Sequence, residues 1–184
     1  MTIRLLQATE AAARLDELCE VLWGCVTEGA SIGFTERDNP QPVRHFWQQQ
    51  LPALAAGDKH LLVAEQEGKV VATVMLVTAM PPNGLHRAEV CKLLVHPTAR
   101  RTGLARQLMQ RVEALAQSHQ RELLVLDTRV GDAASALYDS LGWQESGTIP
   151  AYALSVTGER DATRIMYKML PRLEATADQE QSTG

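Results

Sequence analysis

The 184-residue sequence lacks most patterns that mark membrane-bound, disulfide-bonded or metal-binding proteins. No apolar run approaches the roughly 18 residues of a membrane span, and the start lacks the long apolar core of a signal peptide. The three cysteines form no CxxC pair, so the sequence predicts neither a zinc site nor a disulfide framework. We therefore expect reduced thiols, no metal, no membrane partner and a cytoplasmic location.

Positive charge is also scarce. Lysine and arginine number 18 against 22 aspartates and glutamates, which gives a net charge of -4. Dedicated nucleic-acid binders usually show a basic excess or stripe, so we expect no nucleic-acid partner. Hydrophobic residues at 45% and charged residues at 22% are ordinary for a globular domain. Any recognition of phosphate must therefore be local.

Hydrophobic periodicity predicts one α/β (α+β) domain over residues 1–171 and a polar, disordered tail over 172–184. We expect a central mixed, mostly antiparallel twisted sheet of six or seven strands flanked by helices. The predicted strands cover 3–8, 60–66, 69–78, 86–95, 122–128 and 164–170. The predicted helices include one capped by Thr9, one over 43–57 that Pro52 bends or splits, one from Leu104, and one over 132–142. The strand over 69–78 is apolar on both faces and should lie inside the sheet.

A short loop with two arginines and one glycine follows the strand over 86–95 and precedes a helix. The first N–H groups of a helix have no internal partner, and the helix dipole adds positive charge there. Gly103 would let an anion approach these groups, and Arg100 and Arg101 supply charge. The loop matches neither GxxxxGK[ST] nor GxGxxG. It therefore predicts an anion site of another type.

The run Arg-Arg-Thr-Gly-Leu-Ala over 100–105, preceded by "LLVHP", resembles the acyl-CoA signature [RQ]-x-x-G-x-[GA] of the GNAT family of N-acetyltransferases. A second segment, "LYDSLGW", matches the family pattern at Tyr138, Leu141, Gly142 and Trp143. One departure is Gly131, where the family often has an asparagine that contacts the cofactor arm. The resemblance runs from the first strand to the last. It implies the single-domain GNAT fold and acetyl-CoA (coenzyme A) as cofactor.

The resemblance also implies how the cofactor is held. The pantetheine arm would pair with the end of the strand over 86–95, with a backbone N–H near Leu93 holding the acetyl oxygen. The pyrophosphate would lie on the amides of the loop. The expected cofactor contacts are Leu93, Leu94, Val95, Arg100, Arg101, Thr102, Gly103, Leu104, Ala105 and Tyr138.

Direct attack of an amine on a thioester needs a base, an oxyanion donor and an acid, but no protein nucleophile. We predict Tyr138 as the acid and Glu89 or Asp127 as the base. Strand alternation would place Glu89 on the face of Cys91, Leu93 and Val95, on the order of 13 Å from the acetyl-holding end, so a water relay could be needed. Asp127 ends an apolar strand, and we expect burial to help it accept a proton or bind an ammonium group. Either carboxylate could instead simply orient a cationic amine.

Two further segments, "EGASIGF" at 28–34 and "PPNGLHRAEVCKL" at 81–93, resemble the tabtoxin-resistance branch of the family, which acetylates a small β-lactam amino acid. Both segments could also be plain turns. The expected substrate contacts are Ser31, Phe34, Asn83, Glu89 and Asp127. These features predict an acetyl-CoA-dependent N-acetyltransferase that acts on a small-molecule amine through a ternary complex, such as a toxin- or antibiotic-resistance enzyme. The alternatives are a peptide or protein N-acetyltransferase and a non-catalytic acyl-CoA-binding module. Members of the family often form homodimers, so the resemblance also makes a homodimer a candidate assembly.

Overall fold

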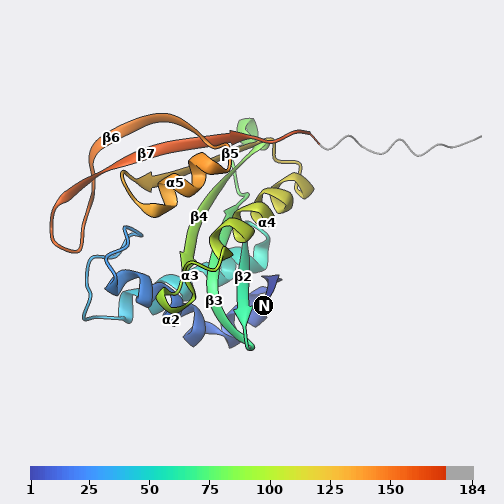
Figure 1. The fold of residues 1–184 in the computed structure, drawn as a ribbon. Coiled ribbons are helices and arrows are strands. Elements are labelled where there is room, and N and C mark those ends of the chain that lie inside the picture. Colours follow the sequence, from blue (N-terminus) through green and yellow to red (C-terminus); the bar gives the residue numbers. More distant parts are fainter. Residues whose placement is uncertain (173–184) are drawn as a thin grey trace, which may run out of the picture.

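A single sheet of seven strands organises residues 1–172, the part of the chain that the computed structural model describes (Figure 1). The strand order is β1-β2-β3-β4-β5-β7-β6, and every neighbouring pair is antiparallel except β4 and β5. This confirms the predicted mixed, mostly antiparallel sheet. The predicted tail over 172–184 lies outside the described residues apart from its first residue. The strands are β1 Thr2–Leu6, β2 Lys59–Gln66, β3 Lys69–Val77, β4 Arg87–Val95, β5 Leu123–Arg129, β6 Gln144–Leu154 and β7 Arg160–Met169.

Helices cover both faces of the sheet (Figure 1). One face packs against α4 (Leu104–Ser118) and α5 (Ala133–Ser140), and the other against α1 (Ala8–Ala13), α2 (Leu15–Thr27) and α3 (Gln41–Ala56). Each face has its own buried cluster, which is why β3 is apolar on both sides, as predicted for an interior strand. No helix among the described residues is long and apolar enough to cross a membrane.

Three local predictions differ from the structure. The first helix is broken at Arg14 into α1 and α2, and Gln7 rather than Thr9 precedes it, with its N–H donating to the Glu10 carboxylate at 2.9 Å. The helix α3 runs unbroken through Pro52. The strand β6 was not predicted, because Gly147 and a proline interrupt it and almost all of its residues are exposed, which removes any apolar alternation.

The parallel pair β4 and β5 is short, and this leaves an opening in the sheet. The two strands pair only from Arg87 to Glu89, opposite Leu123 to Val125, whereas β4 stays paired with β3 as far as Val95. The edge of β4 that faces β5 therefore has no strand partner over residues 90–95. We call this the open edge of β4.

Candidate active site

The segment between β4 and α4 forms a tight loop, here called the cofactor loop (residues 97–105). A 3-10 turn at Pro97–Ala99 is followed by two positive φ angles, 63° at Arg101 and 80° at Gly103. The Thr102 hydroxyl donates to the Ala99 carbonyl at 2.7 Å and closes the turn. Gly103 is the N-cap of α4 in the left-handed conformation, which glycine adopts without strain.

The start of α4 offers unused hydrogen-bond donors. No side chain caps the helix, and its first turn contains no acidic residue. Within residues 1–172, none of the backbone N–H groups from 101 to 106 donates a hydrogen bond. Free amides at the positive end of a helix dipole bind anions, so the loop fits the pyrophosphate of an acyl-CoA.

The two arginines of the loop lie differently. Arg100 donates from Nε to the Val95 carbonyl at 3.3 Å, and its Nη2 lies 3.9 Å from the Sγ of Cys25 on α2. Arg101 is exposed to solvent. The Arg100 side chain therefore fastens the loop to β4 and α2 in this structure, and Arg101 is the freer of the two charges for a phosphate group.

The helix α2 packs very closely against the start of the cofactor loop. A Cβ on Gly24 would lie 2.9 Å from the ring of His96 and 3.0 Å from Pro97. The same helix ends at Thr27 and leads into the segment 28–40, here called the acceptor loop. One rigid element thus connects the cofactor loop to the acceptor loop.

A β-bulge in β4 changes which side chains share a face. Lys92 has a φ of 53°, and the register with β3 shifts between Thr73 and Met75. Before the bulge Ala88 and Val90 face α4, whereas after it Leu93 and Val95 do. Our expectation that Glu89 and Cys91 share a face with Leu93 and Val95 is therefore wrong, because one extra residue reverses the alternation.

Tyr138 lies on α5 beside the opening between β4 and β5. Its side chain is 6% exposed and packs near Trp143, with ring centroids 6.0 Å apart. Burial raises its pKa, and the neighbouring Asp127 and Cys91 raise it further. Its hydroxyl has no hydrogen-bond partner among the described residues, yet it is not sealed from solvent. Tyr138 is therefore a protonated phenol at the site with an unused proton.

The two predicted bases both border the opening. Glu89 lies on β4 and is half-buried, and Asp127 lies on β5 one strand away. Asp127 is exposed, so the burial expected for it is wrong: the gap beyond the short β4–β5 pairing leaves it open to solvent. Both act on the nearby Cys91, whose pKa is raised to about 11, first by burial and then by the two carboxylates. That thiol stays protonated at neutral pH and is a poor nucleophile.

Asn83 lies far from two of the other predicted substrate contacts, Ser31 and Phe34. It is on the 3-10 turn Pro82–Gly84, before the first residue of β4. That is the closed end, where β4 and β5 pair, whereas Ser31 and Phe34 lie near the C-terminal end of β5. The structure brings Ser31 and Phe34 together and leaves Asn83 at the opposite end.

A pocket of about 350 Å³ lies between the acceptor loop and the hairpin of β6 and β7. Ser31 and Phe34 line it on one side, and residues 152–156 line it on the other. Phe34 packs edge-on against Phe46 at 5.8 Å, and Lys92 lies 5.1 Å above the Phe46 ring. The pocket wall is thus linked to the bulge of β4. We call this cavity the acceptor pocket.

Arg129, the last residue of β5, is a site residue that the sequence reasoning missed. Its guanidinium pairs with Asp132 at 2.8 Å and Asp161 at 3.3 Å, and Nη1 donates to the Gly29 carbonyl at 3.2 Å. It joins the acceptor loop to β7 and to the start of α5, the helix that carries Tyr138. No signal in the sequence singles out this arginine, because its partners lie up to 100 positions away.

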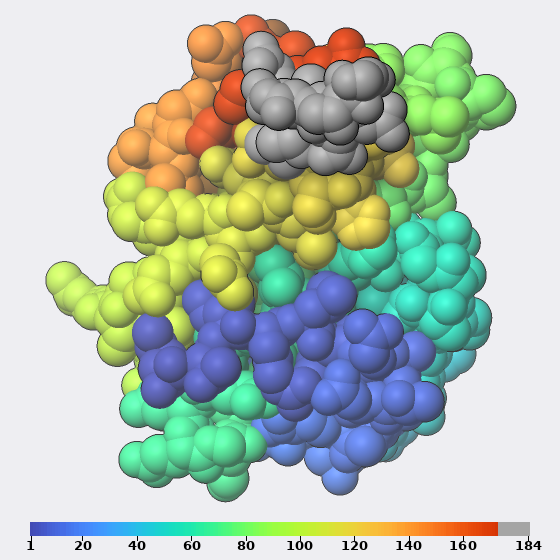
Figure 2. All heavy atoms as spheres, turned by 90° about the vertical axis from the view of Figure 1, so that its right-hand side faces the viewer, coloured from blue at the N-terminus to red at the C-terminus, as the bar shows by residue number. Residues whose placement is uncertain are grey.

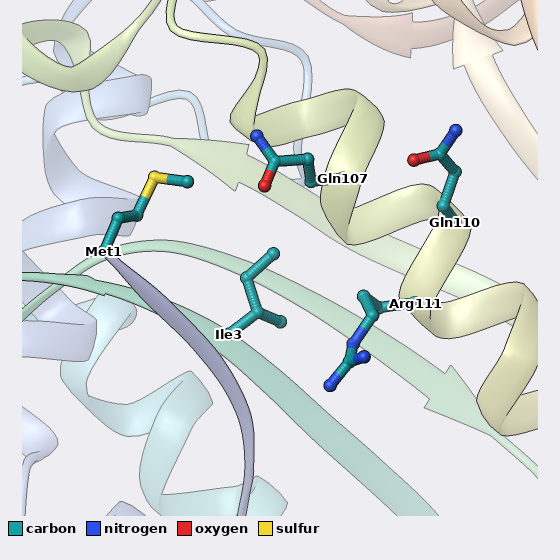
Figure 3. Close-up of a pocket in the computed structure, with 5 residues that line it drawn as sticks. All are labelled: Met1, Ile3, Gln107, Gln110 and Arg111. Carbon is teal, nitrogen blue, oxygen red and sulfur yellow. The ribbon is translucent and has the colours of Figure 1, made fainter.

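A second hollow, of about 310 Å³, lies between β1 and α4. Figure 2 shows the N-terminal residues directly below α4, and Figure 3 shows Gln107 and Arg111 of α4 reaching toward Met1 and Ile3, with Gln110 beside them on the same helix. This hollow is on the β1 side of α4, away from the opening between β4 and β5.

Comparisons with known proteins agree with this geometry. The profile of the GNAT acetyltransferase family matches residues 15–143. A curated relative, an IAA acetyltransferase from Azospirillum brasilense, is 34% identical over 103 residues, which are 55% of this chain and 65% of that protein, slightly under two thirds of its length.

Solved structures share the whole fold. The ribosomal-protein-alanine N-acetyltransferase of Brucella melitensis is 26% identical at a TM-score of 0.73, over 92% of this chain and 100% of its own. A Salmonella typhimurium protein solved with acetyl-CoA is 22% identical at a TM-score of 0.72, over 95% and 96%. The expected fold is confirmed, and the chain belongs to the GNAT acetyltransferase family.

Proposed function

We propose that this protein is an acetyl-CoA-dependent N-acetyltransferase that acetylates the amine of a small molecule by direct attack. The observation that carries the proposal is the meeting of three features at one opening. These are the unpartnered amides of the cofactor loop, the open edge of β4, and the protonated, unpartnered hydroxyl of Tyr138.

Each part of the site has a role in holding acetyl-CoA, which supplies the activated acetyl group as a thioester. The amides of residues 101–105 bind the pyrophosphate, with Arg101 adding charge. The open edge of β4 at residues 93–95 pairs with the amide-containing arm as an added strand would. A backbone N–H near Leu93 donates to the acetyl oxygen and stabilises the developing oxyanion.

The proton movements involve three side chains. Glu89 or Asp127 accepts a proton from the incoming ammonium group, directly or through water, and orients it. Tyr138 donates its proton to the departing thiolate, and its raised pKa ensures that the phenol is protonated across the working pH range. Asp127 is open to solvent, which suits direct contact with an amine that enters from outside.

The size of the acceptor pocket supports a small substrate. A volume of about 350 Å³ lies at the lower end of small-molecule sites, roughly 300–1,000 Å³. Ser31 and Phe34 in this pocket belong to the segment that resembles the tabtoxin-resistance branch. We therefore include toxin or antibiotic resistance through amine acetylation in the proposal. A homodimer and a cytoplasmic location stay predictions.

A second candidate is acetylation of a peptide N-terminus. The likeness to the ribosomal-protein-alanine N-acetyltransferase of Brucella melitensis favours it, because that match covers nearly the whole chain. The rest of a bound peptide would need to extend out of the acceptor pocket past the β6–β7 hairpin.

Thiol release from acetyl-CoA tests both candidates. We expect release with at least one class among β-lactam amino acids, aminoglycosides, polyamines, simple arylalkylamines and short peptides. Release with peptides alone would select the second candidate. Tight acetyl-CoA binding by calorimetry, with no release for any amine, would contradict both and leave a non-catalytic binding module.

A further inference from the structure

The β6–β7 hairpin is irregular where it meets the acceptor loop. The register between the two strands shifts between Ile149 and Ala153, and Ala151 has a φ of 53°. A bulge of this kind redirects side chains, and here Tyr152 becomes part of the acceptor pocket. Figure 1 shows the hairpin curling toward the loop between α2 and α3.

The pocket is lined mainly by apolar side chains, with Ser31, Thr35 and Ser155 as its neutral polar side chains. Its larger side chains are Ile32, Phe34, Tyr152, Leu154 and Val156, and no carboxylate lines it. The one charged lining residue, Arg129, already pairs with two aspartates. A polyamine or an aminoglycoside carries several ammonium groups, and this pocket offers no carboxylate for a second one.

Two of these apolar side chains are left in water. Tyr152 is 53% exposed and Leu154 is 59% exposed, although both border a concave cavity. Burying large apolar groups of this kind is favourable, so a ligand with an apolar surface would gain by covering them.

The acceptor pocket lies next to Asp127, one of the two proposed bases. Asp127 and Arg129 are two residues apart on β5 and share a face, which separates them by about 7 Å. If the amine of a ligand contacts Asp127, a substituent a few bonds from that amine therefore reaches the acceptor pocket. Phe34 on the far wall is fixed through Phe46 and so presents a defined surface.

We propose that the acceptor is a primary amine joined by a short linker to a single apolar or aromatic group, and that Tyr152 of the β6–β7 hairpin recognises this group. This inference rests on the proposed acetyltransferase function and narrows its substrate class. Phe34 and Tyr152 hold the ring from opposite sides while the amine lies at Asp127 and Glu89.

The test compares acetylation of phenethylamine, tryptamine, alanine and spermidine by the wild-type protein and by Tyr152→Ala. The matched control is Ile149→Ala, which removes another exposed apolar side chain from the same strand outside the pocket. We expect the aromatic amines to be preferred, and Tyr152→Ala to lower their kcat/KM about 10-fold while acetyl-CoA affinity is unchanged. Leu154→Ser gives a second, independent change in the same wall and should act in the same direction.

Each outcome decides the proposal. Loss in Tyr152→Ala but not in Ile149→Ala supports it. Preference for spermidine or alanine, or equal rates in both variants, overturns the inference and leaves the acetyltransferase function intact. Absence of release with every amine, with acetyl-CoA bound, overturns the proposed function and this inference with it.

Discussion

The cofactor loop and the acceptor pocket differ in what they are made of. The loop is one short segment that presents backbone N–H groups, and the left-handed backbone at Gly103 is the position where it favours a particular residue type most clearly. The pocket is assembled from the acceptor loop, the end of β5 and the β6–β7 hairpin, and it presents side chains. A site built from backbone tolerates many sequences and binds a constant ligand, whereas a site built from distant side chains can change its ligand by substitution.

The largest effect should come from Tyr138, which belongs to neither the cofactor loop nor the acceptor pocket. Tyr138→Phe removes the proposed proton donor while keeping the ring that packs near Trp143. We expect kcat to fall by about 100-fold, with acetyl-CoA affinity and the KM for the amine little changed. Steady-state kinetics with each substrate varied in turn measures this. A kcat close to that of the wild type would remove Tyr138 from the mechanism.

A negative charge placed in the first turn of α4 should weaken the binding of acetyl-CoA and leave the acceptor pocket unaffected. Ala105→Glu brings a negative charge beside the amides that we propose bind the pyrophosphate, and repulsion of about 2 kcal/mol predicts a Kd for acetyl-CoA raised about 30-fold. Gln110→Glu is the control, since it adds the same charge to an exposed position more than one turn along the helix. Equal Kd values for the two variants in calorimetry would show that the pyrophosphate lies elsewhere.

A substitution at Arg129 should weaken the binding of the amine and leave the binding of acetyl-CoA unchanged. Arg129→Ala removes the donor to the Gly29 carbonyl and leaves Asp132 and Asp161 facing each other, which loosens the acceptor loop. We expect the KM for the amine to rise about 5-fold, from about 1 kcal/mol of lost interaction, with kcat and acetyl-CoA affinity retained. Arg129→Lys should recover part of the loss. A purely structural role would instead lower the unfolding temperature and leave KM unchanged.

The smallest expected effect concerns pH. Burial raises the pKa of Cys91 to about 11, so the folded protein holds this proton more tightly than the unfolded chain. The stabilisation is complete below the unfolded pKa near 9 and is lost as the pH rises toward 11. Denaturant unfolding at pH 8 and pH 9.7 should show a decline that is about 1 kcal/mol smaller in Cys91→Ala. An identical decline would place the titration in other groups, such as Tyr138.

The same contrast explains what the sequence could predict. The cofactor loop depends on neighbours along the chain, namely an apolar strand, a glycine and a helix, and these leave a local pattern. The bulge at Lys92 leaves no such pattern, and it alone reverses the expected face of Glu89 relative to Leu93. The exposure of Asp127 likewise depends on where the β4–β5 pairing stops, which is a property of the assembled sheet.

The acceptor pocket was the hardest part to predict. Ser31 and Phe34 could be named from a resemblance, but Tyr152 lies in a strand that has no alternation to reveal it, and Arg129 acts through partners in three other segments. Asn83 came from the same resemblance as Ser31 and yet lies at the other end of β4. Resemblance of two turn segments to one relative therefore does not show that the two turns lie at the same end of the sheet.

The contact between Gly24 and the turn at His96 and Pro97 has a consequence for how such a protein can acquire new substrates. The helix α2 has no room to move toward the cofactor loop, so in the proposed mechanism it helps to fix the distance between the acceptor loop and the cofactor loop. A bulkier acceptor cannot be admitted by widening that separation without loss of alignment. We therefore expect a change in acceptor choice to arise on the exposed hairpin, where within residues 1–172 β6 has no neighbouring strand on its outer side and substitutions leave the proposed reaction geometry unchanged.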